Sequence, residues 1–258
     1  MYRKHCASAA LALSLLSGLT QAALVDRGNG MIYDTDRNIT WLANANYFQT
    51  QAAANPNAAA DVIAHVQTVS NDHSTHTLVA SDINANGLMT WWGAMAWAQD
   101  LQYGGFSDWR LPTSLQPDTT CSGQGRTAGI SFGYGCTGNE LGHLFYDELG
   151  GGANVYIQQQ HNANLDLFTQ VKPDYWTGTP WTAAQSGGFA NAAWNFSMHG
   201  EQIGISADAG FNTGAAISYA WAVRDGDIAA TVPEPTTYAL VLAGLIALAV
   251  ARRQRRLG

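Results

Sequence analysis

GGFSDWRLPT, at residues 104–113, is the stretch from which the organisation of this chain can be worked out. Its two leading glycines can end a helix, because glycine reaches positive φ without a Cβ clash. Large apolar side chains follow with Asp108 and Arg110 between them, and Pro112 restricts the backbone before Thr113, which can cap the next element. This order predicts a buried crossing from a helix into a second lobe, with Arg110 paired to an internal acid. An architectural hinge is favoured over an active site, because charges buried in pairs are often structural.

The same stretch resembles the sDWRLPt signature of the Lcl C-terminal domain family, and further stretches match that family in order between residues 28 and 226. The matching residues, here called the family-motif core, are Asp108, Trp109, Arg110, Leu111, Pro112, Trp176, Trp194 and Arg224. The resemblance implies a fold similar to C-type lectin-like domains and formylglycine-generating enzymes. It also implies carbohydrate binding at the cell surface.

Residues 1–23 have the pattern of a cleaved secretory signal peptide. Arg3 and Lys4 give a positive start, residues 7–19 form an apolar run, and residues 20–22 supply a small-x-small cleavage site. We therefore expect one exported domain at residues 24–228, a length suited to a single hydrophobic core.

The C-terminal residues 229–258 resemble a PEP-CTERM sorting signal. An apolar segment, expected to cross the membrane at about residues 236–251, stands between a Pro-Glu-Pro triplet and an arginine cluster. The signal residues are Pro233, Glu234, Pro235, Arg252, Arg253, Arg255 and Arg256. The resemblance implies processing by an exosortase in a Gram-negative bacterium that makes exopolysaccharide, from an inner-membrane-anchored precursor to the cell surface or extracellular matrix. A plain tail anchor is the alternative.

The stretch between these two ends is strongly acidic. Residues 24–232 carry six basic against eighteen acidic side chains, which leaves a net charge of −12. A nucleic acid or an anionic membrane surface needs a basic patch, so both are excluded as partners of this domain. An acidic surface rich in Asn, Gly and aromatic residues suits neutral sugars or calcium better.

Cys121 and Cys136 remain after the signal peptide is removed. In an oxidising compartment they are expected to pair, and a disulfide closing this loop contributes about 3 kcal/mol by chain entropy. A reactive thiol pair is the weaker alternative, because the spacing is not Cys-x-x-Cys. Formylglycine-generating enzymes use cysteines near their C-terminal end for copper, and this chain has none there, so that oxidation chemistry is not expected.

A partial calcium-loop pattern occurs at Asp82, Asn84 and Asn86, which alternate before a glycine. The place of the bidentate glutamate is taken by Gly93, which excludes a standard EF-hand. A calcium loop completed by distant carboxylates and a tight Asn-Gly turn both stay open. We expect no other cofactor.

Two weaker patterns are interpreted as non-functional. His65, His73 and His76 match no standard metal-ligand spacing and are expected in a solvated loop. Residues 129–133 read Gly-x-Ser-x-Gly, but a nucleophile elbow needs a strand before it and a helix after it.

The remaining periodicity predicts an α+β domain with two main helices followed by an antiparallel sheet. Residues 24–42 predict a hairpin and residues 61–69 a weak helix. Residues 90–102 predict the best helix, with Trp92 and Trp97 at its partly exposed border. A second helix is expected at residues 139–149, with His143 exposed. Strands are expected at residues 175–177, 193–197, 217–219 and 221–224.

Three hypotheses for function compete. The favoured one is a non-catalytic carbohydrate-binding or adhesion module, with Trp181 and Asn195 as possible ligand contacts. The second is a structural biofilm-matrix protein without a ligand site. The third is an enzyme, which needs a convergent acid, base or nucleophile set that the motifs do not provide.

Overall fold

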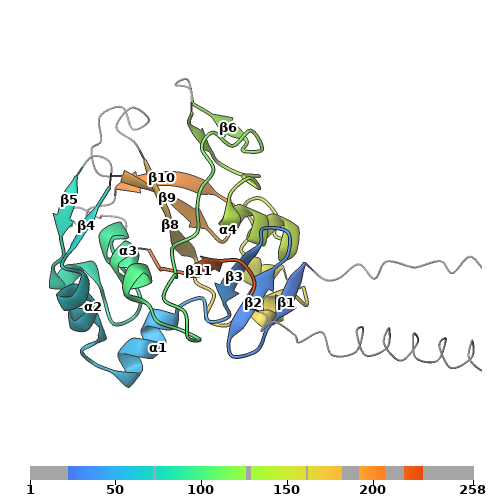
Figure 1. Cartoon of the computed structure of the whole chain (residues 1–258). Coiled ribbons are helices and arrows are strands. Elements are labelled where there is room, and N and C mark those ends of the chain that lie inside the picture. Colours follow the sequence, from blue (N-terminus) through green and yellow to red (C-terminus); the bar gives the residue numbers. More distant parts are fainter. Residues whose placement is uncertain are drawn as a thin grey trace, which may run out of the picture.

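Two antiparallel sheets form the centre of the computed structural model, which describes residues 23–71, 74–125, 129–160, 162–181, 192–206 and 218–228 (Figure 1). The first sheet has the order β1 (Leu24–Asp26), β2 (Met31–Asp34), β3 (Ile39–Leu42) and β11 (Val223–Asp225). The second has the order β10 (Gln202–Ser206), β9 (Ala192–Ser197) and β8 (Asp174–Trp181). The predicted α+β class is therefore confirmed, with two main sheets in place of the single one expected.

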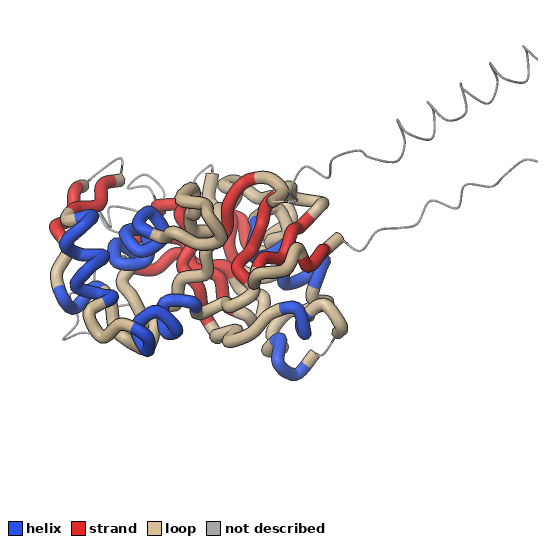
Figure 2. Tube along the Cα trace, turned by 60° about the horizontal axis from the view of Figure 1, so that its bottom comes forward, coloured by secondary structure: helices blue, strands red, loops and turns tan. Residues whose placement is uncertain are grey.

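Smaller elements surround these sheets. Two ribbons pair β4 (Thr68–Ser70) with β5 (Thr75–Thr77) and β6 (Gly123–Gln124) with β7 (Ser131–Phe132). The α-helices are α1 (Tyr47–Ala54), α2 (Ala58–Val66), α3 (Trp91–Asp100) and α4 (Glu140–His143). A π-helical turn, η2 (Leu144–Glu148), continues α4, and short 3₁₀ turns are η1 (Ala80–Asp82), η3 (Ile157–Gln159) and η4 (Leu165–Leu167). Figure 1 places α1, α2 and α3 at the end opposite β1 and β2, and Figure 2 shows this separation from another side.

The N-terminal hairpin forms where the β-prone residues predict it. Strands β2 and β3 pair in antiparallel register from Met31 opposite Leu42 to Asp34 opposite Ile39. The turn between them is held by Asp34, whose Oδ1 accepts the backbone N–H groups of Asp36 and Arg37. Such a side-chain-capped turn is typical of aspartate. It fixes the backbone around Asp34 and leaves its second carboxylate oxygen directed elsewhere.

Helix α3 begins as predicted, because Thr90 accepts the N–H of Gly93 and caps it. The expected exposed border is wrong: Trp92 and Trp97 are each only 1% exposed. Elements absent from the sequence-based prediction cover them. His76 stacks on Trp92, and Gln51 of α1 accepts the indole N–H of Trp97.

Helix α1 explains that difference. The sequence predicts the first helix only at residues 61–69, but α1 occupies Tyr47–Ala54 and α2 begins at Ala58. Alanine has the highest helix propensity, and packing of Phe48 against Trp97 supplies the tertiary support that a short helix needs. Three helices of eight or more residues therefore occur in the described part of the chain, where two main helices and a weak one were expected.

The stretch at residues 104–113 crosses between the two sheets. Its glycines do not end a helix, since α3 has ended at Asp100; they form a tight turn in which Tyr103 and Phe106 exchange backbone hydrogen bonds. Both glycines have positive φ, which such a turn requires. Beyond it, Arg110 exchanges two backbone hydrogen bonds with Val223 of β11, and the carbonyl of Pro112 accepts the N–H of Gly178 in β8. The predicted crossing is confirmed.

Tryptophans dominate the core that this crossing joins. The fully buried ones are Trp41, Trp91, Trp92, Trp97, Trp176, Trp194 and Trp221. Trp221 stands at a centre of edge-to-face contacts with Trp41 and Phe168, at ring-centroid distances of 5.2 and 5.1 Å. No helix within the described residues is long and apolar enough to cross a membrane. The segment expected to do so, at residues 236–251, lies outside those residues, as do nearly all of the signal peptide and the whole sorting signal.

Candidate functional site

An aromatic hollow lies where the second sheet meets the β6–β7 ribbon. It encloses about 340 Å³ and is lined by Gly125, Ile130, Phe132, Trp181, Trp194, Ile203 and Gly204. Phe132 of β7 and Ile203 of β10 are among the most exposed large apolar side chains of the described residues. Exposed apolar groups gathered at a concave surface are typical of a binding site rather than of a random surface.

Trp181 forms the floor of this hollow. Its ring stacks on that of Trp194, with centroids 5.2 Å apart and planes inclined by 29°. The ring also reaches across β9 to cover Gly204 of β10, where an added Cβ would collide with it. Trp194 is fully buried whereas Trp181 is half-buried. Trp181 is therefore a packed and partly exposed aromatic side chain that lines the hollow, at a residue that the sequence singled out.

Asn195 does not belong to the hollow. Its side chain is buried, and its amide donates to the hydroxyl of Ser218 at 2.8 Å. Neighbouring residues of a strand point to opposite faces of the sheet, so Asn195 and Trp194 cannot share one surface. Trp181 and Asn195, which the sequence names as possible ligand contacts, are therefore not brought together at the hollow, and a ligand contact by Asn195 stays a prediction. Most of the loop that follows Trp181, residues 182–191, lies outside the described residues.

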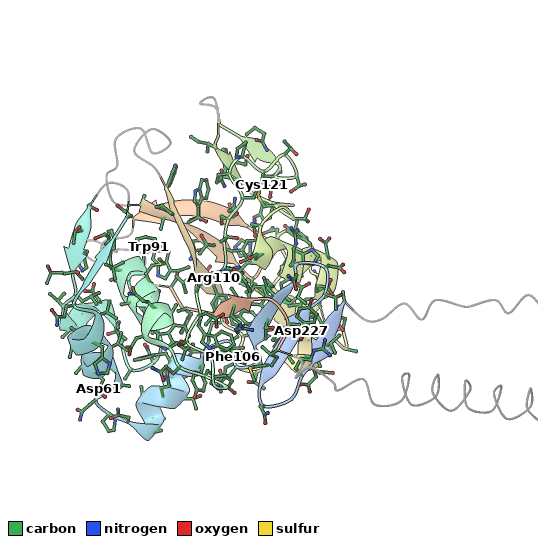
Figure 3. The ribbon with its side chains drawn as sticks, viewed as in Figure 1. Asp61, Trp91, Phe106, Arg110, Cys121 and Asp227 are labelled. Carbon is green, nitrogen blue, oxygen red and sulfur yellow. A yellow bond between two sulfur atoms is a disulfide. The ribbon has the colours of Figure 1, made fainter. Side chains whose placement is uncertain are left out.

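Charged residues of the family-motif core take part in three ion pairs. Asp108 accepts two hydrogen bonds from Arg224, each 2.8 Å long. Arg110 binds Glu140 through two further hydrogen bonds of 2.8 Å and also contacts Asp225. Figure 3 shows Arg110 in the middle of the fold, among strands of both sheets. The internal partner predicted for Arg110 is thus Glu140, at the start of α4.

The electrostatics of this cluster indicate an architectural role. Burial alone would lower the pKa of Arg110, but its hydrogen bonds and charge attraction to Glu140 outweigh burial and raise it. The hydrogen bonds from Arg224 lower the pKa of Asp108. Both effects stabilise the charged forms. The charges therefore hold the crossing segment to β11 and α4.

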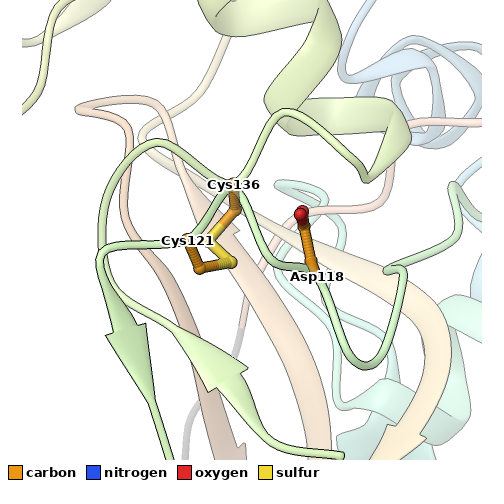
Figure 4. A group of neighbouring side chains, drawn as sticks. All are labelled: Asp118, Cys121 and Cys136. Carbon is orange, nitrogen blue, oxygen red and sulfur yellow. A yellow bond between two sulfur atoms is a disulfide. The ribbon is translucent and has the colours of Figure 1, made fainter.

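Cys121 and Cys136 form the predicted disulfide (Figure 4). Asp118 lies beside it, but the carboxylate of Asp118 already accepts hydrogen bonds from Thr120 and Gly138. Sulfurs that are bonded to each other are not thiolates, so these three side chains do not make a metal centre. The bridge instead closes the base of the β6–β7 ribbon, which carries Phe132 into the aromatic hollow.

Ser131 of the Gly-x-Ser-x-Gly pattern is fully buried on the same ribbon. Its hydroxyl donates to Gln124 and accepts the backbone N–H of Asp118. The residue lies on a two-residue strand of a hairpin, not on a strand-to-helix turn. The pattern is therefore a structural hydrogen-bond site within the ribbon.

The side chains of the calcium-loop pattern are engaged by the protein itself. Asp82 is buried and accepts from the hydroxyl of Thr90 and the N–H of Val79, while His76 lies 2.9 Å from its second oxygen. Asn84 and Asn86 both bond to the backbone of Leu88. This arrangement favours the tight-turn alternative, with Gly87 at a φ of 90°.

The histidine pattern does not converge on one point either. His65 contacts Asp100, and His76 contacts Asp82. His73 lies outside the described residues.

A buried cluster of Asp34, His143 and Glu148 was missed by the sequence-based prediction. These side chains are 0%, 8% and 6% exposed. Nε2 of His143 lies 3.7 Å from Oδ2 of Asp34 and 3.4 Å from Oε1 of Glu148. The prediction that His143 is exposed is wrong, because helix α4 packs against the turn after β2.

The pKa values of this cluster are shifted by its burial. Burial raises the pKa of Glu148, and the nearby negative charge of Asp34 raises it further. Burial alone would lower the pKa of His143, but the interaction with Asp34 outweighs it and raises that pKa. Nδ1 of His143 is 2.9 Å from the more exposed Asp147.

The π-helical turn explains why the cluster was missed. In a regular α-helix, residues five apart lie about 140° apart around the axis, so His143 and Glu148 would face different directions. In η2 the N–H of Leu149 bonds to the carbonyl of Leu144, five residues back, which widens the turn. His143 and Glu148 then reach the same space. Buried charged residues at such a turn are a signal of function, since π-turns often occur at functional sites.

Comparison with known families matches residues 231–256 to the PEP-CTERM protein-sorting motif. The match covers the tail and not the described domain. No curated protein and no solved structure matches the chain. The motif confirms the predicted sorting signal, so the chain is an exported, exosortase-sorted protein of a Gram-negative bacterium with a membrane-anchored precursor.

Proposed function

We propose that the exported domain is a non-catalytic cell-surface or matrix module that binds a neutral polysaccharide in the aromatic hollow. The observation that carries this proposal is the half-buried Trp181, which stacks on Trp194 and packs over Gly204 in a hollow that Phe132 and Ile203 also line. A surface of this kind matches the apolar C–H face of a sugar ring. Burying that face contributes roughly 25 cal/mol for each Å² removed from water.

The rigidity of the hollow supports the proposal. Trp181 is fixed by stacking before any ligand arrives, and the ribbon that carries Phe132 is closed by the Cys121–Cys136 disulfide. A preorganised surface loses little side-chain freedom on binding, which leaves more of the contact energy as affinity. This preorganisation matters most for a ligand that makes few contacts, such as a sugar ring that is bound through one face.

The charge of the domain restricts the kind of polysaccharide. A net charge of −12 over residues 24–232 repels uronic-acid or phosphate polymers at low salt. Neutral exopolysaccharide is therefore the expected class. The resemblance of the family-motif core to the Lcl C-terminal domain family supports carbohydrate binding, and Trp194 is the member of that core that lines the hollow.

The alternative of a structural matrix protein makes a different prediction. In that case the hollow is a packing feature and no soluble glycan binds. An enzyme would in addition need a reacting side chain at the hollow, whose lining, among the residues that the structure describes, consists of apolar side chains and glycines.

The test measures binding of the purified full chain to neutral exopolysaccharide from the producing strain, by isothermal titration calorimetry. Phe132→Ala and Trp181→Ala are expected to weaken binding by at least tenfold, about 1.4 kcal/mol. Tyr156→Ala is the matched control, because Tyr156 is an equally exposed aromatic residue that does not line the hollow. Trp181 is half-buried, so Trp181→Ala could unfold the domain. Phe132 is exposed, so Phe132→Ala leaves the core intact and tests the hollow even in that case.

Two results would count against binding at the hollow. One is a folded wild-type chain that binds no neutral glycan, which favours the structural alternative. The other is equal binding by wild type, Phe132→Ala and Tyr156→Ala, which places the glycan elsewhere.

A further inference from the structure

The second carboxylate oxygen of Asp34 and Nε2 of His143 are buried without a hydrogen-bond partner. Both atoms face the same space as a carboxylate oxygen of Glu148, and the three lie within 4.8 Å of one another. A buried polar atom without a partner is rare and destabilises the fold. Two such atoms directed at one point need a common explanation.

Direct hydrogen bonds among Asp34, His143 and Glu148 do not explain why these two atoms lack partners. A charge-assisted N–H···O bond is about 2.7–2.9 Å long. The distances from Nε2 of His143 to Asp34 and Glu148 are 3.7 and 3.4 Å. They are too long for an imidazolium that donates its proton to either acid, so a simple ion pair leaves both acids poorly satisfied.

A bound metal ion fits the same distances. Ligand atoms on a tetrahedral zinc ion, with bonds of about 2.0–2.1 Å, lie roughly 3.4 Å from each other. The measured separations of 3.4 and 3.7 Å are close to this value. One imidazole nitrogen and two carboxylate oxygens are also a ligand set that zinc accepts, whereas calcium prefers oxygen alone.

We propose that Asp34, His143 and Glu148 bind one divalent transition-metal ion, with Zn²⁺ the preferred occupant. The ion ties the β2–β3 turn to α4 and η2.

Charge balance supports this ion. Two buried carboxylates with a neutral imidazole carry two negative charges, and even a protonated imidazole leaves one uncompensated. A divalent cation neutralises both carboxylates and allows His143 to stay neutral, as a metal ligand must. The positive charge of Arg37 acts on His143, but its guanidinium donates to the backbone carbonyls of Thr137 and Gly138 and does not occupy the space between the three side chains.

The surroundings orient each ligand as in established metal sites. Asp147 lies 2.9 Å from Nδ1 of His143, so the imidazole donates there and leaves the lone pair of Nε2 directed at the two acids. Two backbone N–H groups hold the other oxygen of Asp34. The π-turn places Glu148 beside His143. The low exposure of all three ligands indicates a structural ion and not a catalytic one.

The site shares no residue with the aromatic hollow, so the two proposals stand or fall separately. What the ion does is mechanical: it joins the N-terminal sheet to the helix that carries Glu140, the partner of Arg110.

The test measures metal in the full chain, exported by a Gram-negative host and purified without added metal or chelator. Inductively coupled plasma mass spectrometry is expected to find close to one equivalent of zinc. Removal of the ion by a strong chelator should lower the Tm, and stoichiometric Zn²⁺ should restore it. Replacement by Co²⁺ should give the visible absorption of a low-symmetry cobalt site.

Variants separate a metal site from an ion pair. Glu148→Gln and His143→Gln should abolish the Zn²⁺-dependent rise in Tm. Asp147→Asn should keep the site but weaken its zinc affinity by roughly 10–100-fold, because it removes only the group that orients His143. His199→Gln is the matched control, since His199 also pairs with an acid, Glu201, but is more exposed; it should leave the metal content unchanged.

The proposal is overturned if the folded wild-type chain carries no metal and neither Zn²⁺ nor Mn²⁺ changes its Tm. It is also overturned if Glu148→Gln and His199→Gln retain equal metal content. Measuring the wild-type chain with and without chelator keeps the test decisive even if a ligand variant does not fold.

Discussion

Arg110 connects several elements of the fold, because its side chain binds acids of α4 and β11 and its backbone pairs with β11. Its guanidinium contacts two acids that differ greatly in burial: Glu140 is 13% exposed and Asp225 is 77% exposed. An exposed ion pair is worth little, because water and salt screen it. Removing a buried acid leaves the guanidinium of Arg110 without that hydrogen-bond partner, and this costs more stability than losing an exposed ion pair.

This contrast predicts different costs for two substitutions around one cation. Glu140→Gln should reduce the free energy of unfolding by about 2–3 kcal/mol, because a charged acceptor of Arg110 and of the N–H of Thr113 is weakened. Asp225→Asn should cost less than about 1 kcal/mol. Urea denaturation of both variants measures the difference, and equal losses would refute the assignment of Glu140 as the main partner.

Sequence alone indicated at this scale that Arg110 needed an internal acid, since an arginine among large apolar residues is costly without one. It did not indicate which acid, because Glu140 is distant in sequence and is brought near only by the capped start of α4. The same limit applies to His143. A histidine on a polar helix face is predicted as exposed unless the packing partner is known.

At the scale of elements, the β6–β7 ribbon depends on covalent support. Each of its strands has two residues, and a two-stranded ribbon of that size is not stable by itself. The Cys121–Cys136 disulfide closes the loop that contains it. Phe132, at the rim of the hollow, therefore depends on the bridge for its position.

Replacing both cysteines with serine should lower the free energy of unfolding by about 3 kcal/mol, since a loop of this length loses that much chain-entropy restraint. The same variant should bind the polysaccharide more weakly if Phe132 contributes to the hollow. Calorimetric unfolding and glycan titration check the two effects. A stability matching that of the wild type would show that the bridge is dispensable.

The π-turn η2 could not be predicted from the periodicity of the sequence. The helix at residues 139–149 was predicted from its cap and apolar spacing, and the cap is confirmed by the N–H of Gly142 bonding to Asn139. The widening at Leu144 follows from packing. It brings His143 and Glu148 together while Leu144 and Phe145 stay in the core.

At the scale of the whole molecule, the domain and its tail have separate tasks. The described domain is organised by the crossing segment between two sheets, and the PEP-CTERM motif at residues 231–256 directs sorting. The motif follows β11, whose hydrogen bonds with β3 and with Arg110 hold the end of the domain in the first sheet. The sorting motif therefore follows a strand that is held in the first sheet.

Replacing Pro233, Glu234 and Pro235 with alanine should stop exosortase processing, because the triplet that marks the motif is lost. The unprocessed precursor should then accumulate in the membrane fraction of the producing strain, detected by immunoblot. Leu257→Ala is the control, since Leu257 lies outside the matched residues. Normal processing of the triple variant would show that the triplet is not read.

Sequence by itself determined the exported state, the sorting tail, the disulfide, the N-terminal hairpin, the capped start of α3 and the crossing at residues 104–113. Each of these depends on local chemistry: apolar length, charge flanks, turn residues and caps act within a few positions of the chain. Only the tertiary structure decided that Trp92 and Trp97 are buried, that Asn195 is separate from Trp181, and that Asp34 meets His143 and Glu148. Those features depend on which surfaces pack together, and burial between distant segments leaves no fixed spacing in the sequence.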